Sequence, residues 1–376
     1  VRLAQLTGLS TTTITNLISE LLEQGIVVEE GTEKSSRRRG AGRPRTALRL
    51  VPTARHAVAV HIGVGSVRVA VGDLHARLLS SLSLAHPLEK SPKEVLGETV
   101  VLVEKAISQS GVNPQSIVGI GVGASGLVDP HTGINVVAPN LGWRDVPIRD
   151  WFAQRLGLPV CVDNNVRAMA LGEALFGAGQ DVHVLAFVYA RIGVGAGFVV
   201  GGQLYRGSGA GAGEIGHTTV IPEGGEPCRC GNTGCLETLV SEPAIIRLAK
   251  ELAHQDRHGI LATYLQNGEG TTIERIFAAA RAGDMPTRTM LNERARYMGV
   301  ALANLVNILN PELILLGGVF AQGQDLLLPV TEATIRQRAF ANLGERVRLQ
   351  TTSFGHQAGV VGAAALALNT FFYQPA

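Results

Sequence analysis

The chain has little cysteine, with four residues in 376. Cys228, Cys230 and Cys235 lie within eight positions, and Cys161 stands apart from them. A disulfide framework needs cysteines spread along a chain that enters an oxidising compartment, and the first residues here do not have the pattern of a secretory signal. The clustering therefore indicates a metal-binding loop rather than cross-links.

Long apolar runs are also missing from the sequence. No uninterrupted apolar stretch approaches the roughly 20 residues that cross a bilayer. The chain is nevertheless 45% hydrophobic, and 376 residues are enough for two or three domains that each bury a core. We expect a soluble, cytoplasmic protein with no membrane partner.

Acidic residues are absent from the stretch between Lys34 and Arg49, which holds seven cations. The formal net charge of the whole chain is only +2. The first fifty residues carry eight Lys or Arg against five Asp or Glu, so positive charge is concentrated there. This distribution indicates an anionic polymer as the partner of the N-terminal part.

The first fifty residues have the pattern of two helices followed by a strand. The segment 3–10 predicts a short helix that turns at Gly8, with Ser10 capping a second helix that ends near Gly25. A strand over residues 26–29 follows. Any amphipathic helix with a solvated outer face would share part of this pattern, but the order of the elements favours a winged helix-turn-helix. The apolar face of the second helix is formed by Ile14, Leu17, Ile18, Leu21 and Leu22.

The outward face of the second predicted helix carries small polar side chains. We predict that Thr12, Thr15 and Asn16 read bases in a DNA major groove, where an asparagine amide can pair with adenine. The glycine-rich basic stretch behind the helix suits phosphates and a narrow minor groove. A merely solvated charge run is the alternative. The predicted backbone-contacting residues are Arg37, Arg38, Arg39, Arg43 and Arg45.

A zinc site is predicted from His217, Cys228, Cys230 and Cys235. One imidazole and three thiolates form a tetrahedral zinc ligand set, and four protein ligands leave no open position, so we expect one structural zinc ion per chain. Ordinary buried thiols beside a surface histidine are the alternative. Two carboxylates bracket the cluster, and both can accept hydrogen bonds from the hydroxyl groups of a polyhydroxylated ligand. They are Glu214 and Glu237.

An internal repeat is present in the rest of the chain. Ile62-Gly63-Val64-Gly65 recurs as Ile192-Gly193-Val194-Gly195, and each copy is followed by a strand-like segment. We predict that each copy is a strand, a glycine turn and a second strand, which gives two α/β lobes of similar plan. A small ligand would bind in the cleft between duplicated lobes.

The motifs over residues 214–217 and 228–237 resemble those of the ROK family, Glu-Ile-Gly-His followed by Cys-x-Cys-Gly-x-x-Gly-Cys-x-Glu. This family contains sugar kinases and sugar-responsive transcriptional repressors on a two-lobed actin-like (ribonuclease H-like) fold. The resemblance implies a winged helix-turn-helix over residues 1–50, a first α/β lobe over 55–180 completed by a C-terminal helix over 356–370, and a second lobe over 181–355 that carries the zinc loop.

The resemblance also indicates that the parts of a kinase have changed. Where sugar kinases of this fold have an acidic residue and a Gly-Gly-Thr turn at the first hairpin, this chain has His61 and Val64. The second turn, Gly193-Val194-Gly195, lacks the family's threonine hydroxyl. Asn165 stands in place of the aspartate that acts as base, and an amide cannot accept the proton. A register shift that made Asp163 the base would be the alternative.

Sugar contacts are implied for Gly126, Asn164, Asn165, Glu214, His217 and Glu237. Trp143 could serve the ligand or pack between the lobes, and Glu173 is predicted to be an acid on a helix surface. The sequence therefore predicts a DNA-binding regulator, most simply a repressor, that binds a sugar or sugar derivative without phosphorylating it. The alternatives are an active ATP-dependent sugar kinase with an added DNA-binding segment and a regulator controlled by a protein partner. Paired recognition helices require a homodimer or homotetramer on a double-stranded operator.

Overall fold

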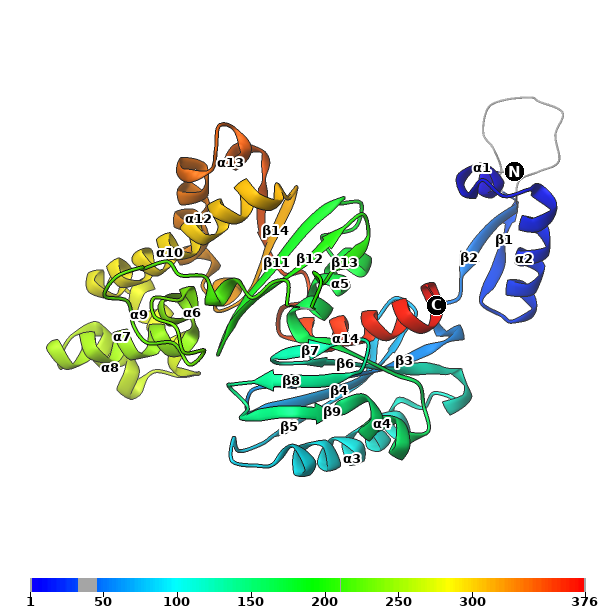
Figure 1. Cartoon of the computed structure of the whole chain (residues 1–376), viewed down its shortest axis with the longest axis horizontal. Coiled ribbons are helices and arrows are strands. Elements are labelled where there is room, and N and C mark those ends of the chain that lie inside the picture. Colours follow the sequence, from blue (N-terminus) through cyan, green and yellow to red (C-terminus); the bar gives the residue numbers. More distant parts are fainter. Residues whose placement is uncertain (1, 33–45, 210, 375–376) are drawn as a thin grey trace.

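The N-terminal unit stands at one end of the molecule in the computed structural model, which describes residues 2–32, 46–209 and 211–374 (Figure 1). It contains helices α1 (Arg2–Thr7) and α2 (Thr11–Glu23) and the antiparallel strands β1 (Val27–Thr32) and β2 (Thr46–Leu50). The predicted cap of the second helix is confirmed, because the Ser10 side chain accepts the Thr13 N–H at 3.1 Å. The predicted arginine contacts at positions 37, 38, 39, 43 and 45 lie outside the described residues.

The N-terminal unit buries little apolar surface by itself. Leu6 is 73% exposed, and Leu17, which helical spacing places on the apolar face of α2, is 44% exposed. Ile14, Ile18, Leu21 and Leu22 are half-buried. The two helices therefore share an apolar surface that is only partly covered within the described residues.

The first lobe is built on a five-stranded sheet in the order β10-β6-β3-β4-β5. Its strands are β3 (His56–Gly63), β4 (Ser66–Asp73), β5 (Leu78–Ala85), β6 (Ile117–Ala124) and β10 (Val160–Asn164). Helices α3 (Pro92–Ser110) and α4 (Ile148–Leu156) pack with one face of this sheet in a core that also contains Trp143. Trp143 is thus a core residue of the first lobe, 3% exposed. It lies in a small sheet of β7 (Leu127–Asp129), β8 (Ile134–Ala138) and β9 (Trp143–Pro147).

The second lobe repeats this plan. Its sheet has the order β13-β12-β11-β14-β15, from β11 (Val184–Ala190), β12 (Val194–Val200), β13 (Gln203–Tyr205), β14 (Leu313–Gly318) and β15 (Arg348–Thr351). In each sheet an antiparallel hairpin pairs in parallel with a later strand, β3 with β6 and β11 with β14. The predicted duplication is present, but the two matching sequence motifs occupy different positions in their hairpins. Ile62 and Gly63 end a strand, whereas Ile192 and Gly193 lie in the turn.

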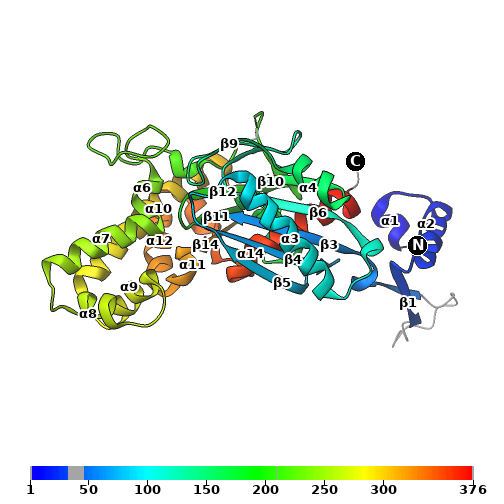
Figure 2. The ribbon, with the colours of Figure 1, turned by 90° about the horizontal axis from the view of Figure 1, so that it is seen from below.

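The helices of the second lobe share one apolar core with its sheet. They are α6 (Leu236–Val240), α7 (Glu242–Gln255), α8 (Ile260–Asn267), α9 (Thr272–Arg281), α10 (Met285–Leu309), α11 (Val319–Gln322), α12 (Gln324–Arg338) and α13 (Leu343–Arg346). Helices α7, α8 and α9 form the end of the molecule opposite the N-terminal unit (Figure 2). Helix α10 begins at Met285, because Asp284 caps it by accepting the Thr287 N–H at 2.8 Å. No helix in the described ranges is long and apolar enough to span a bilayer.

Two helices join the lobes at the centre of the molecule. Helix α5 (Asn165–Phe176) packs on β11 and β12 of the second sheet, and α14 (Ala358–Leu368) packs on the first sheet (Figure 1). A Cβ added to Gly362 would lie 2.5 Å from the Ala168 carbonyl carbon, and one added to Gly121 would lie 2.0 Å from the Ala363 oxygen. Glycine therefore allows α14 to lie backbone to backbone against α5 and β6.

The position of Glu173 differs from the one predicted. It was expected on a helix surface, but it is fully buried at the end of α5. Its Oε1 accepts hydrogen bonds from Thr352 Oγ1 at 2.6 Å and the Ser353 N–H at 2.7 Å, and its Oε2 accepts the Ala178 N–H at 3.1 Å. These donors satisfy the buried carboxylate and fasten α5 to the segment before α14.

Candidate functional site

The predicted zinc ligands lie together. The ligand atoms of His217, Cys228, Cys230 and Cys235 are all within 4.8 Å of one another. Cys230 Sγ lies 3.7 Å from Cys235 Sγ, and Cys228 Sγ lies 3.7 Å from His217 Nδ1. A tetrahedral zinc ion places neighbouring ligand atoms about 3.6–3.8 Å apart, so the cluster has the dimensions of such a site.

The chemistry of the cluster also suits a divalent cation. Burial raises the pKa of the Cys235 thiol to about 12, and burial likewise raises the pKa of Cys228. Buried thiols of this kind stay protonated unless a cation stabilises the thiolate. The four residues would hold a zinc ion, whose role in a closed four-ligand sphere is to fix the loop.

Two glycines place the metal loop against the second sheet. A Cβ on Gly216 would lie 2.1 Å from the Val194 oxygen, and one on Gly213 would lie 2.0 Å from the Ala196 oxygen. Gly213 also has φ of +101° and accepts the Ala196 N–H at 2.7 Å. The backbone that carries Glu214 and His217 can therefore press directly on β12.

The carboxylates predicted to bind a ligand face this same region. Glu237 Oε2 accepts the Val194 N–H at 2.9 Å, which leaves its other oxygen for further contacts. Burial raises the pKa of Glu214, and Glu237 adds to that rise while His217 and Arg167 oppose it. With Nδ1 of His217 turned to the thiols, Nε2 is the ring nitrogen available to a ligand.

The asparagine pair lies at the junction of β10 and α5. Asn164 caps α5, since its Oδ1 accepts the N–H groups of Val166 at 2.8 Å and Arg167 at 3.2 Å. Its Nδ2 donates to the Gly126 carbonyl at 2.9 Å, which leaves one amide hydrogen for another acceptor. Gly126 has φ of +101°, and a Cβ there would lie 2.5 Å from both Ala138 Cβ and the Val137 oxygen. The loop thus requires glycine at this position.

Asn165 contacts the first hairpin rather than a charged group. Its Nδ2 lies 3.4 Å from His61 Nε2 and donates to Ser125 Oγ at 3.3 Å. Burial, together with the positive charges of Arg68 and Arg191, lowers the pKa of His61 to about 4. His61 is therefore neutral at pH 7. A neutral histidine and a serine hydroxyl therefore neighbour Asn165, the residue predicted to replace the base of a kinase.

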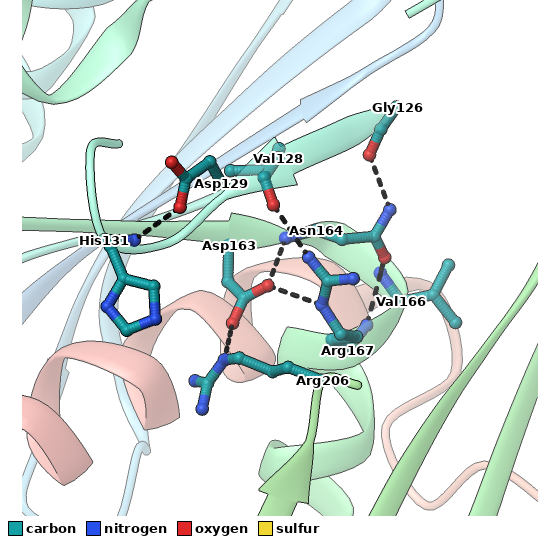
Figure 3. Close-up of polar contacts among 9 residues, drawn as sticks. All are labelled: Gly126, Val128, Asp129, His131, Asp163, Asn164, Val166, Arg167 and Arg206. Carbon is teal, nitrogen blue, oxygen red and sulfur yellow. Dashed lines mark hydrogen bonds and ion pairs between the residues drawn. The ribbon is translucent and has the colours of Figure 1, made fainter. Parts of the chain in front are cut away.

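Asp163 is engaged by two arginines (Figure 3). Its Oδ1 lies 2.6 Å from Arg167 Nε and its Oδ2 lies 2.8 Å from Arg206 Nε. Asp163 is fully buried, and Arg167 is 1% exposed. The Asn164 N–H also donates to Oδ1 at 2.7 Å. Both carboxylate oxygens of Asp163 therefore already have donors from neighbouring residues.

Comparison with known proteins identifies the group to which these features belong. The model of the ROK family matches residues 57–370. The chain belongs to the ROK family. It is 32% identical to the xylose repressor of Caldicellulosiruptor bescii over 376 residues, which covers all of this chain and 92% of the repressor.

Solved structures of ROK proteins have the same fold as this chain. A ROK family transcriptional regulator described as a homologue of the Escherichia coli Mlc protein superposes with a TM-score of 0.83 at 29% identity, covering 97% of this chain and 90% of the regulator. A ROK family glucokinase from Streptomyces griseus, in complex with glucose and AMPPNP, superposes with a TM-score of 0.75 at 32% identity. The glucokinase covers 84% of this chain, and this chain covers all of the glucokinase.

The N-terminal unit of this ROK protein exposes the side chains predicted to read bases. Thr12, Thr15 and Asn16 are exposed on α2. The Thr15 hydroxyl donates to the Thr11 carbonyl at 2.9 Å, so its hydrogen is engaged within the helix while its lone pairs stay open. These positions are compatible with contact to a large partner.

Some residues of the ROK site were missed by reasoning from the sequence. Arg229, inside the zinc loop, donates to Asn140 Oδ1 at 3.0 Å and so links the second lobe to the first. Arg167 and Arg206 pair with Asp163. Each of these arginines is a charged residue in an otherwise apolar or glycine-rich segment, which is a signal visible in the sequence. The local sequence does not indicate which acidic residue each arginine pairs with.

Proposed function

We propose that this ROK protein is a DNA-binding transcriptional repressor whose two-lobed part binds a sugar effector without phosphorylating it. The observation that carries the proposal is the environment of Asn165, which has His61 and Ser125 as neighbours. The neighbouring carboxylate, Asp163, is paired with Arg167 and Arg206 and so does not replace the missing base. Proton removal from a sugar hydroxyl lacks its acceptor, while hydrogen bonding to that hydroxyl remains possible.

The effector site combines groups from both lobes. The first lobe supplies the Gly126 backbone and the amides of Asn164 and Asn165. The second supplies Glu214, His217 and Glu237, held by a structural zinc ion on His217, Cys228, Cys230 and Cys235. Amides and carboxylates of this kind recognise the hydroxyl groups of a monosaccharide. The names of the relatives, xylose repressor and glucokinase, make D-xylose and D-glucose the first compounds to test.

The DNA-binding part of the proposal concerns the first fifty residues. Helix α2 would enter a major groove with Thr12, Thr15 and Asn16, and β1 and β2 would form the wing. The arginines between positions 37 and 45 would contact phosphates and the minor groove. Effector binding between the lobes of a dimer would shift the population of lobe arrangements and thereby the spacing of the two recognition helices.

Two titrations test the proposal. Calorimetry with D-xylose and D-glucose measures effector binding, and fluorescence anisotropy with the duplex upstream of the protein's own gene measures DNA binding with and without sugar. We expect DNA affinity that falls steeply with salt and changes when the sugar is present. The Arg43→Ala/Arg45→Ala pair should weaken DNA binding, with Lys105→Ala on α3 as the matched control. Unchanged affinity in the double variant would refute the minor-groove contact.

The second candidate is an ATP-dependent sugar kinase, which the similarity to the glucokinase favours. The two candidates separate when the protein is incubated with magnesium ATP and the same sugars. Under our proposal no sugar phosphate accumulates. Turnover above the background of an Asn165→Ala variant would replace the repressor proposal with the kinase one.

A further inference from the structure

Arg206 connects the two lobes at their neighbouring edges. It directly follows β13, the edge strand of the second sheet, whereas Asp163 lies on β10, the edge strand of the first sheet. Arg206 Nε lies 2.8 Å from Asp163 Oδ2, with Asp163 fully buried and the Arg206 side chain 35% exposed. Figure 3 shows Arg206 and Arg167 reaching different oxygens of the one carboxylate.

Both partners of this ion pair are connected through the backbone to residues of the proposed effector site, Asp163 directly and Arg206 eight positions before Glu214. On the first-lobe side, Asp163 Oδ1 accepts the Asn164 N–H, and Asn165 follows. On the second-lobe side, the Arg206 carbonyl accepts the Ala212 N–H at 3.3 Å, and the Gly213 carbonyl accepts the Ala196 N–H at 2.7 Å. The ion pair therefore fixes the start of a segment whose end carries Glu214.

Removal of the Arg206 side chain should not unfold the first lobe. Asp163 keeps Arg167 as a buried counter-ion at 2.6 Å, and Arg167 also donates to the Val128 carbonyl at 3.1 Å. Loss of the Arg206 side chain would leave no unpaired charge in the core, which is the usual reason that breaking a buried pair unfolds a protein. A buried carboxylate in a low-dielectric environment still holds a second guanidinium in a narrow range of geometry.

We propose that Arg206 is a positioning residue of the effector site, which sets the distance between the amides of Asn164 and Asn165 and the carboxylate of Glu214. This inference rests on the proposed function in one respect: the ligand is taken to touch both lobes. Without Arg206 the two halves of the site separate more often, so a ligand must first bring them together and binds more weakly. Arg206 itself need not touch the ligand.

Hydrogen exchange tests the positioning role with no sugar and no DNA present. The amides of Val166, Arg167, Ala196 and Ile215 report on the two halves of the site. We expect Arg206→Ala to speed their exchange several-fold and Arg206→Lys to restore part of the protection. The matched control is Arg281→Ala, which removes an arginine from the exposed pair with Asp325 inside the second lobe, 2.6 Å apart, and should leave these amides unchanged. Wild-type protection in Arg206→Ala would overturn the inference.

Calorimetry with D-xylose and D-glucose gives the second measurement. For whichever sugar binds the wild type, Arg206→Ala should raise the Kd about tenfold and Arg281→Ala should not. An equal Kd in wild type and Arg206→Ala would also overturn the positioning role. If neither sugar binds the wild type, the proposed function loses its support while the exchange result still decides on Arg206. Should the alanine variant fail to fold, the lysine variant is compared instead, and unaltered exchange and Kd there would count against the proposal.

Discussion

The side-chain nitrogen of Asn165 lies 3.4 Å from Nε2 of His61. Under the proposed function, Asn165 replaces the base of a sugar kinase and His61 replaces the acidic residue of the first hairpin, so the two replaced groups face each other. Neither side chain is negatively charged, and the two form a neutral, partly buried contact. This relationship leads to the first two predictions.

Asn165→Asp should not by itself create a kinase. The new carboxylate would lie beside His61 and raise the pKa of that imidazole from its depressed value near 4, because an opposite charge stabilises the protonated ring. The hairpins at Val64 and Val194 would still lack the groups that bind phosphate. We expect no sugar phosphate with magnesium ATP and a higher His61 pKa by NMR titration. Sugar phosphorylation by this single variant would contradict the assignment of the changed hairpins.

His61 should make stability depend on pH between about 4 and 6.5. Its folded-state pKa of about 4 lies below the ordinary value of 6.5. The unfolded chain then binds more protons across this window, so stability is lost as pH falls from 6.5 toward 4 and is regained as pH rises. The loss from this one group is at most about 3 kcal/mol. Urea unfolding at several pH values gives the free energy of unfolding of wild type and His61→Gln. This free energy should depend less steeply on pH in the variant, and an equal pH dependence in both proteins would rule out the effect.

Metal removal should loosen the loop over residues 217–235. Cys235→Ser is expected to lose the bound ion and to lower the Tm by more than about 5 °C, since binding of a structural zinc ion is coupled to folding. Cys161→Ser serves as the control, because this thiol lies away from the cluster and donates to the Ile120 carbonyl at 3.6 Å. Metal content by mass spectrometry should give one zinc per chain for wild type and the control. A Cys235→Ser protein with full zinc content would disprove the ligand set.

Glu173→Ala should destabilise the joint between α5 and α14. The substitution removes a fully buried carboxylate and leaves the partly buried donors Thr352 Oγ1 and Ser353 N–H without their acceptor, at a cost of about 1–3 kcal/mol. Glu332→Ala provides the comparison, because its pair with Arg336 is exposed and should contribute less than about 1 kcal/mol. Chemical denaturation measures both. Equal stabilities for the two variants would mean that the buried carboxylate does not hold this joint.

Gly216→Ala should displace the segment that carries Glu214 and His217. The added Cβ would meet the Val194 oxygen at 2.1 Å, and relieving such a clash costs about 1–3 kcal/mol. Gly97→Ala in α3 meets nothing within 4 Å and should stabilise the protein by up to about 1 kcal/mol through helix propensity. Thermal melting compares the two, with zinc content as the second readout. An alanine at 216 that keeps both wild-type values would show that the backbone contact with β12 is not tight.

The sequence by itself was sufficient for features that depend on near neighbours in the chain. The Ser10 cap acts over three residues, and the four clustered residues predicted to bind zinc occupy a stretch of nineteen positions in which glycine turns return the chain. Local propensity and ligand spacing require no knowledge of the rest of the fold.

Only the tertiary structure decided the partners of the buried charges. Glu173 meets Thr352, 179 positions away, and Asp163 meets Arg206, 43 positions away. The sequence predicted a surface position for Glu173, because a lone acid on a helix is usually solvated. It left Asp163 as a possible base. Burial of a carboxylate is stable only when donors from distant segments converge on it, and that convergence is set by the packing of the two sheets and the two central helices.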